Sequence, residues 1–510
     1  MKNFRIGKKK LALVMMALSL SVFSCDDEKQ FLETGVKPAS SAMRIDYDID
    51  KLYNAKSSLE REFGKSLAKS LNESRMLREV IKNKALEMFN DDYEILYEML
   101  KDEKVENNLT VEDLITKNLT DKKSLKTLDS EYPTLSILVP SLPKDVFNAN
   151  KWNVDTEIPK VAIRLTTTND VPIINADGSE NLLEGKYTPA FPVLVVKENE
   201  RVITDKNKDF KNLKTRSIDS KRGVKFKFLS DEFDRKLKKT KRLAFGVQLD
   251  PKLISAYDTY NNADGWQRDF IYYNITPNQT RGQFRYDFKD GLKSFKMVGD
   301  PMLAYNKIAD QWDDPHINGI TSGPQWTDGF FEFKVTCLVN GRNGVGAELI
   351  MPIGANPSDL FELTYTEIGG WFNSLYLLTG VSLKQMDLNL PILNWDLDQY
   401  SAAIRIGIEE VDLTTTTVLS ESTTIKFANN FEVTGGIKEK VGLKFGASSE
   451  TSQTQTYQRT FIQGNDQLGD VTINFADQII NSKLPFIDLY SLREYNTTWY
   501  SISFEPMRVQ

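Results

Sequence analysis

Histidine is almost absent from this chain. The 510 residues include only one, His316, in a loop-like Asp-Asp-Pro-His segment. Zinc proteases of the His-Glu-x-x-His type need two histidines, so that class is excluded. A Ser-His-Asp triad would depend on His316, yet the chain has no Gly-x-Ser-x-Gly elbow, and the glycine-rich signatures that hold nucleotide phosphates are also missing. The sequence therefore nominates no catalytic residue and no nucleotide cofactor.

The N-terminal apolar run is too short to cross a membrane. It covers residues 11–23, which as a helix would measure about 20 Å, against a hydrocarbon core of about 30 Å. Five basic residues precede it, as in the n-region of a secretory signal. We therefore expect residues 1–24 to be a signal peptide that is removed after export.

The end of this signal has a distinctive pattern. Residues 22–25 read Val-Phe-Ser-Cys, which resembles the lipobox of bacterial lipoproteins. The resemblance implies that cleavage precedes Cys25, that its sulfur is diacylated and that its new amine is acylated. Residues 25–42 would then be the lipidated cysteine and a flexible polar tether. The alternatives are a plain secretory signal and an uncleaved anchor helix.

Three acidic residues, Asp26, Asp27 and Glu28, follow the cysteine directly. They resemble the export tag of surface-exposed lipoproteins of Bacteroidota. The resemblance implies an outer membrane lipoprotein displayed at the cell surface. If these residues are only a solvated linker, the periplasmic leaflet is the alternative.

Cysteine is nearly as scarce as histidine. Cys25 and Cys337 are the only two, and an acylated Cys25 cannot form a disulfide. The mature protein therefore has no intramolecular disulfide despite an oxidising compartment. Cys337 lies in an apolar, strand-like run, and we expect an inert buried thiol there.

Basic residues are in deficit overall but concentrated locally. Removal of residues 1–24 leaves 60 basic and 71 acidic residues, a formal net charge of −11, which argues against nucleic acid as a partner. Residues 201–245, in contrast, hold sixteen Lys or Arg and six Asp or Glu. We interpret residues 206–248 as a basic linker or strand edge. A patch for lipid headgroups, lipopolysaccharide phosphates or acidic glycans is the alternative.

The first part of the mature chain has a helical pattern. Apolar residues recur at steps of three and four, notably over residues 76–89 and 95–100, and glycine is almost absent. Thr110 and Asp113 have the spacing of a capping box. The pattern predicts a helical domain over residues 43–130.

Prolines and short β-branched runs then replace the helical pattern. Asp177-Gly178 between two apolar runs indicates a hairpin, and we expect a small β unit over residues 131–205. Residues 249–510 are rich in aromatic and alternating segments and are expected to form a large β domain. The segments taken as strands there are residues 270–273, 330–339, 403–408, 471–475 and 500–504.

The predicted fold class is therefore α+β and multidomain. A helical N-terminal domain is followed by a predominantly antiparallel, sandwich-like C-terminal region.

Calcium is the metal that the acidic loops favour. Asp264, Asp396, Asp398 and Asp412 lie in oxygen-rich loops, and hard cations take six to eight oxygen ligands. The strand after Asp398, flanked by such loops, resembles C2-type sandwiches that bind calcium in their loops. Turn chemistry alone also explains such clusters of Asn, Asp and Gly.

Residues 414–461 form an unusual Ser- and Thr-rich segment. Long alternating strands of this composition resemble the membrane-inserting region of aerolysin-like pore formers. An apolar stripe of about ten residues, which a lipid-facing strand needs, is missing. A solvated antiparallel sheet is the preferred interpretation.

These observations predict a membrane-anchored lipoprotein that acts as a non-catalytic binding or interaction module. Its partner would be a surface glycan, peptide or protein. A carboxylate-dependent hydrolase such as a glycosidase and an aerolysin-like membrane-inserting protein are the alternatives. The sequence alone identifies no ligand-binding residue.

Overall fold

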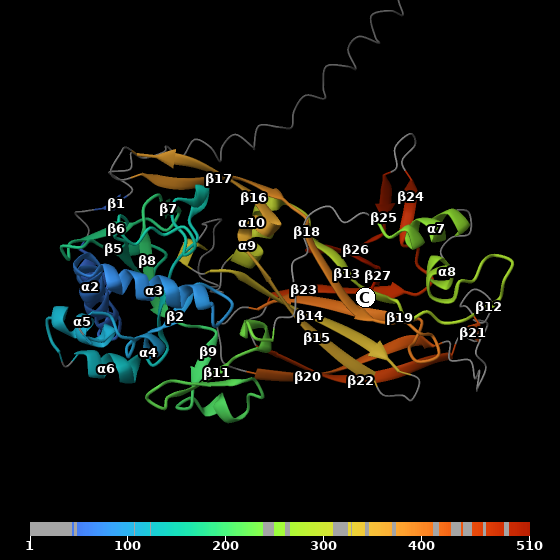
Figure 1. Ribbon diagram of the computed structural model, residues 1–510, viewed down its shortest axis with the longest axis horizontal. Coiled ribbons are helices and arrows are strands. Elements are labelled where there is room, and N and C mark those ends of the chain that lie inside the picture. Colours follow the sequence, from blue (N-terminus) through green and yellow to red (C-terminus); the bar gives the residue numbers. More distant parts are fainter. Residues whose placement is uncertain are drawn as a thin grey trace, which may run out of the picture.

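The fold combines an N-terminal part in which most helices lie with a C-terminal part dominated by β-strands (Figure 1). This confirms the predicted α+β class. The computed structural model describes residues 43–44, 48–106, 108–122, 124–237, 249–260, 266–309, 325–327, 329–341, 346–369, 374–411, 418–429, 440–441, 451–462, 466–483 and 489–509.

The N-terminal body is built on a seven-stranded sheet in the order β1-β6-β5-β4-β8-β3-β2. Its pairs are antiparallel except β4 with β8. The strands are β1 Met43–Arg44, β2 Glu94–Leu96, β3 Leu135–Leu138, β4 Lys160–Ile163, β5 Val171–Ile174, β6 Glu180–Leu183 and β8 Val193–Glu198. The helices are α2 Ser57–Glu73, α3 Arg75–Glu87, α4 Tyr97–Leu100, α5 Val111–Asn118 and α6 Ser124–Glu131.

Helix α2 explains why helices and strands form one body. Its Phe63, Leu67 and Leu71 are buried in the same hydrophobic core as Val161 and Ile163 of β4. The helices have one apolar face each, and the sheet supplies the surface that buries it. The regions 43–130 and 131–205, expected as two units, thus share one core.

Two of the local sequence predictions for this body are confirmed, and a third is wrong in part. Thr110 and Asp113 form the predicted capping box at the start of α5, and the hairpin at Asp177-Gly178 joins β5 to β6. The helical prediction for residues 95–100 is wrong at its start, where Ile95 and Leu96 belong to β2. Both side chains are buried, and a short, fully buried strand has no alternation that would distinguish it from a helix.

Part of the basic stretch, interpreted above as a linker or strand edge, is folded into strands. Residues 202–228 contain a three-stranded sheet with strands β9 Val202–Thr204, β10 Ser217–Asp219 and β11 Lys225–Phe228. Phe226 and Phe228 of β11 are buried in one hydrophobic cluster with Phe233. Arg222 pairs with Asp102 and Glu112 of the helical region, so part of the basic charge is neutralised within the molecule.

The C-terminal body is a sandwich of two four-stranded antiparallel sheets. One has the order β18-β13-β27-β26 and the other β15-β14-β19-β23. Phe295 of the first sheet contacts Phe333 of the second, with ring centroids 5.1 Å apart. The strands are β13 Phe288–Met297, β14 Phe331–Asn340, β15 Gly346–Ala355, β18 Met386–Leu393, β19 Ala403–Glu410, β23 Asp466–Asn474, β26 Glu494–Asn496 and β27 Tyr500–Arg508.

Four of the five strand predictions in this body are confirmed, and the fifth is wrong. The segment 270–273 belongs to a helix, α8 Gln267–Tyr273. Ile271, Tyr272 and Tyr273 are all buried, so the continuous apolar run fits a buried helix as well as a strand. Cys337, in the centre of β14, is fully buried as expected, and burial raises the pKa of its thiol to about 12.

The remaining helices and strands surround the sandwich. The Ser- and Thr-rich region contains a two-stranded antiparallel ribbon in which β20 and β22 pair along their length. The elements are α7 Pro251–Tyr260, α9 Pro301–Ala309, α10 Pro357–Leu360, β12 Arg281–Gly282, β20 Val418–Asn429, β21 Lys440–Val441, β22 Thr451–Ile462, β24 Ile480–Lys483 and β25 Tyr490–Leu492. None of the helices that the structure describes combines the length and apolar character that a bilayer crossing needs.

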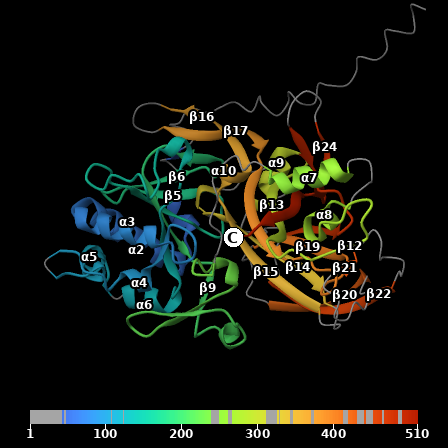
Figure 2. The same cartoon turned by 45° about the vertical axis from the view of Figure 1, so that its right-hand side comes forward.

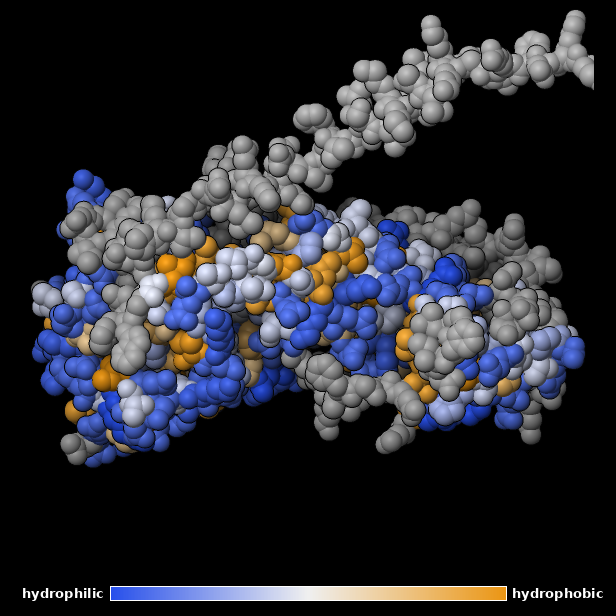
Figure 3. All heavy atoms as spheres, turned by 90° about the horizontal axis from the view of Figure 1, so that it is seen from above, coloured by the Kyte–Doolittle hydropathy of each residue, from blue (hydrophilic) through white to orange (hydrophobic). Residues whose placement is uncertain are grey.

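A further sheet, with the three-stranded order β16-β17-β7, connects the two bodies. Strands β16 Phe361–Ile368 and β17 Leu375–Leu383 form a hairpin, and β17 pairs with β7 Tyr187–Pro189 of the N-terminal body. Figures 1 and 2 show the hairpin above the junction, with the helical region on one side and the sandwich on the other. The face seen in Figure 3 is mainly hydrophilic, with small apolar areas separated by polar side chains.

Candidate functional site

A cavity of about 750 Å³ lies between the two bodies. This volume is typical of sites for small organic ligands. Its walls come from the loops after α3 and β3, from residue 235 in the basic region, from residue 330 just before β14, and from β15, α10 and β18 of the C-terminal body. We name it the junction cleft. Its lining residues are Met88, Asp91, Tyr93, Ser141, Asp145, Asn148, Asn150, Lys151, Arg235, Phe330, Ile353, Gly354, Asn356, Ser358, Met386, Asp387 and Leu388.

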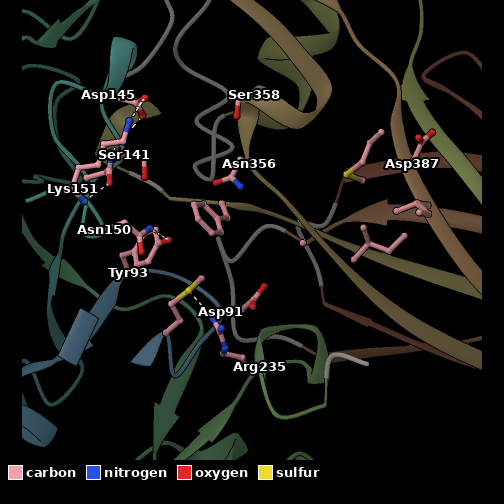
Figure 4. Close-up of a pocket in the computed structure, with 17 residues that line it drawn as sticks. Asp91, Tyr93, Ser141, Asp145, Asn150, Lys151, Arg235, Asn356, Ser358 and Asp387 are labelled. Atoms are coloured by element: carbon pink, nitrogen blue, oxygen red, sulfur yellow. Dashed lines mark hydrogen bonds and ion pairs between the residues drawn. The ribbon is translucent and has the colours of Figure 1, made fainter. Parts of the chain in front are cut away.

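The N-terminal wall carries a compact set of polar side chains. Lys151 Nζ lies 2.6 Å from Asp145 Oδ2, and Asn150 Nδ2 donates a hydrogen bond of 2.6 Å to the Tyr93 hydroxyl. In Figure 4 these side chains lie on one side of the cleft, and Asp387 lies across from them. The cleft thus presents hydrogen-bonding groups from both bodies to one space.

The backbone around the cleft includes several unusual conformations. Met88, Asp91, Lys144 and Asp145 have positive φ angles of 48°, 63°, 54° and 56°, and they are four of the eight non-glycine residues with positive φ in the described part of the chain. Three of the four line the cleft, and Lys144 precedes one of them. Such conformations cost of order 1–3 kcal/mol each and concentrate at functional sites. This clustering favours a functional role for the cleft.

An aromatic pair forms part of the wall of the cleft. The rings of Tyr93 and Phe330 meet edge to face, with centroids 5.6 Å apart. The Phe330 backbone is held on both sides, because its N–H donates to Asp92 Oδ2 at 3.2 Å and its carbonyl accepts from Arg201 Nη2 at 2.9 Å. The two bodies therefore fix this ring together.

Buried charges lie behind the aromatic pair. Arg201 is 1% exposed and has Asp92 at 3.5 Å and Glu332 of β14 at 3.7 Å. Burial raises the pKa of Asp92 above its ordinary value, although the Arg201 charge opposes the shift. Burial likewise raises the pKa of Glu94 to about 7, opposed by Lys197. This ionic cluster spans the junction and supports the cleft from beneath.

The chemical character of the cleft is polar and close to neutral. Its lining contains three carboxylates, Asp91, Asp145 and Asp387, and two cations, Lys151 and Arg235. Asparagine, serine and tyrosine side chains supply further donors and acceptors. The cleft is therefore suited to a ligand with many hydroxyl or amide groups rather than to a highly charged one.

The predicted calcium residues are only partly described. Asp396 is buried, and its Oδ1 accepts hydrogen bonds from the Tyr273 hydroxyl at 3.3 Å and from the Asp398 N–H at 3.1 Å. Asp264 and Asp412 lie outside the described residues. Within the described ranges no group of three or more His, Cys, Asp or Glu side chains forms a metal site. Calcium binding remains a prediction.

Five further residues singled out in the sequence also lie outside the described part of the chain. They are Cys25, Asp26, Asp27, Glu28 and His316. The cleft residues carried no such signal, because they come from separate segments of the chain that meet only in the fold. The Asx-type spacing around Asn148 and the Asn-Pro start of α10 mark turns and helix starts, not binding sites.

Comparisons with known proteins give no relative. No family model matches the chain, and neither a curated protein nor a solved structure resembles it significantly.

Proposed function

We propose that this protein is a lipid-anchored surface lipoprotein that binds an uncharged oligosaccharide in the junction cleft. The observation that carries this proposal is the lining of the cleft, in which polar side chains from both bodies and a pair of aromatic rings surround one cavity. Oligosaccharides offer hydroxyl groups to such polar side chains and flat, apolar faces to aromatic rings.

The charge of the cleft supports an uncharged ligand. Asp145 and Lys151 form an ion pair, so neither needs a charged group of the ligand to balance its charge. The remaining charged lining residues, Asp91, Asp387 and Arg235, do not form a field of one sign. A polyanion or polycation would find no matching patch here.

The anchor part of the proposal comes from the N-terminal sequence. The lipobox at residues 22–25 and the acidic residues 26–28 resemble those of surface lipoproteins. An acylated Cys25 keeps the folded body beside the membrane, and the tether of residues 26–42 lets the cleft face the surroundings.

A glycan array with the full chain in mild detergent tests the proposal. We expect binding to neutral oligosaccharides. Asp387→Asn and Tyr93→Ala should each weaken binding about tenfold or more, since each removes a contact of about 1.4 kcal/mol. Asp258→Asn, an exposed change on α7, is the matched control. Failure to bind any neutral glycan, or equal binding by all variants, contradicts the proposal.

A glycoside hydrolase is the second candidate, because three carboxylates line the same cleft. Such enzymes use a pair of carboxylates about 5–10 Å apart on either side of the scissile bond. Incubation of array-positive oligosaccharides with the protein, followed by detection of new reducing ends, separates an enzyme from a binder. Loss of product with Asp91→Asn or Asp387→Asn would assign the carboxylates.

A further inference from the structure

A second cavity of about 410 Å³ adjoins the junction cleft. The two cavities share five lining residues, so they are neighbours with a common wall. We name the second cavity the apolar annex. The shared residues are Ser141, Asp145, Phe330, Asn356 and Ser358.

The walls of the annex are more apolar than those of the cleft, although charged side chains such as Lys144 and Lys186 also line it. The hairpin β16–β17 contributes Leu363, Tyr365 and Leu378, which are all only half-buried. Trp326 and Phe361 contribute further aromatic rings. Apolar side chains left partly exposed in a concave surface mark a binding site more often than an accident of packing.

Another wall of the annex is the proline-containing loop after β3. Leu142 and Pro143 line the annex, and the consecutive positive-φ residues Lys144 and Asp145 follow them. Asp145 lines both cavities, so the unusual backbone turn lies at their boundary. The same turn thus contributes apolar side chains to the annex and a carboxylate that lines both cavities.

We infer that the ligand is amphiphilic, a glycoside that carries an alkyl, acyl or aryl group, and that the annex takes this apolar group. The inference rests on the proposed function, because it assigns the polar part of the same ligand to the junction cleft. The adjacency of the two cavities, which share five lining residues, supports one ligand rather than two. The annex is larger than the cavity of about 150 Å³ that takes a benzene molecule, so it has room for a ring or a short chain.

A homologous series of n-alkyl β-D-glucosides, from methyl to octyl and below their micelle concentrations, tests the inference by calorimetric titration of the full chain. Burial of each methylene group contributes about 0.8 kcal/mol, so affinity should rise about fourfold per methylene until the annex is full. An affinity that does not depend on chain length overturns the inference.

Two variants locate the effect. Leu378→Gln and Leu363→Gln place a polar group in the annex wall and should remove most of the chain-length dependence. They should leave the affinity for methyl glucoside unchanged. Leu349→Gln, another half-buried leucine on β15 that lines neither cavity, is the matched control. If both annex variants keep the wild-type dependence, the annex is not the site.

This design separates the two proposals. In one outcome, affinity depends on chain length and Leu378→Gln removes this dependence, while no sugar on the glycan array binds. That result supports the annex as the site of the apolar group but contradicts the oligosaccharide proposal. Sugar binding without chain-length dependence supports the oligosaccharide proposal and contradicts the annex.

Discussion

The carboxylate of Asp92 lies 3.5 Å from the guanidinium of Arg201, and both side chains are buried where the two bodies meet. Arg201 comes from the turn between β8 and β9, and it also faces Glu332 on β14. One cation thus balances the charge of a carboxylate from each body. The same guanidinium donates a hydrogen bond to the backbone carbonyl of Phe330 beside the cleft.

Removal of Arg201 should destabilise the protein strongly. We expect Arg201→Ala to lower the free energy of unfolding by about 3–5 kcal/mol, because Asp92 and Glu332 lose their buried counterion. Lys117→Ala breaks an exposed pair with Glu73 and should cost at most about 1 kcal/mol. Urea denaturation of both variants provides the comparison. Equal, small losses would show that the ionic cluster contributes little.

Glu60 should make stability depend on pH. It is 5% exposed, and burial raises its pKa to about 8 from an ordinary 4.5, while a hydrogen bond from Tyr132 opposes the shift. Between these values the folded state keeps a proton that the unfolded state has lost, so stability falls as pH rises. Glu60 alone contributes a slope of about 1.4 kcal/mol per pH unit.

Glu60→Gln keeps an acceptor for Tyr132 but cannot ionise. The fall in stability from pH 5 to pH 8, measured by urea denaturation, should therefore be shallower than in the wild type by that slope. Glu131→Gln, at the exposed end of α6, is the surface control. If the stability of the Glu60→Gln variant falls with pH as steeply as that of the wild type, Glu60 is not the source of the pH dependence.

Asp396 should stabilise its loop with or without calcium. Its carboxylate accepts hydrogen bonds from Tyr273 and from the backbone of Asp398, so Asp396→Ala should cost about 1–3 kcal/mol. Thermal unfolding in calcium and in chelator tests the metal separately. A wild-type Tm that rises with calcium, and an Asp396→Ala Tm that does not, would identify a calcium site that includes this residue.

Cys25 should carry the membrane anchor. Intact-mass analysis of the protein from native membranes should show a chain that begins at residue 25 and carries fatty acyl groups. The Cys25→Ala form should carry none and should leave the membrane fraction or keep its signal peptide. Wild-type protein without fatty acid would remove the basis for the surface location.

Sequence patterns predicted the long elements well because their signals are local. The capping box at Thr110 and the strand at residues 330–339 both follow from residues close together in the chain. The helix at residues 267–273 was missed because its side chains are buried on all sides, which removes the periodicity that separates a helix from a strand.

The cleft could not be predicted from the sequence, for a different reason. Tyr93 and Phe330 are far apart in the chain and meet only because the two bodies dock. Asp91 and Asp387 have no motif around them that marks a site. Only the tertiary fold brings these groups to one cavity, whereas the acylation signal around Cys25 is contained in four consecutive residues.

The pairing of β7 with β17 has a consequence for how a ligand is received. Backbone hydrogen bonds of this strand pair join the two bodies, and the Arg201 cluster joins them again at a second place. A hinge motion that opened the cavity would have to break one of these connections. We therefore expect the free and the ligand-bound protein to have nearly the same shape, and domain closure to contribute only a small free-energy cost to binding.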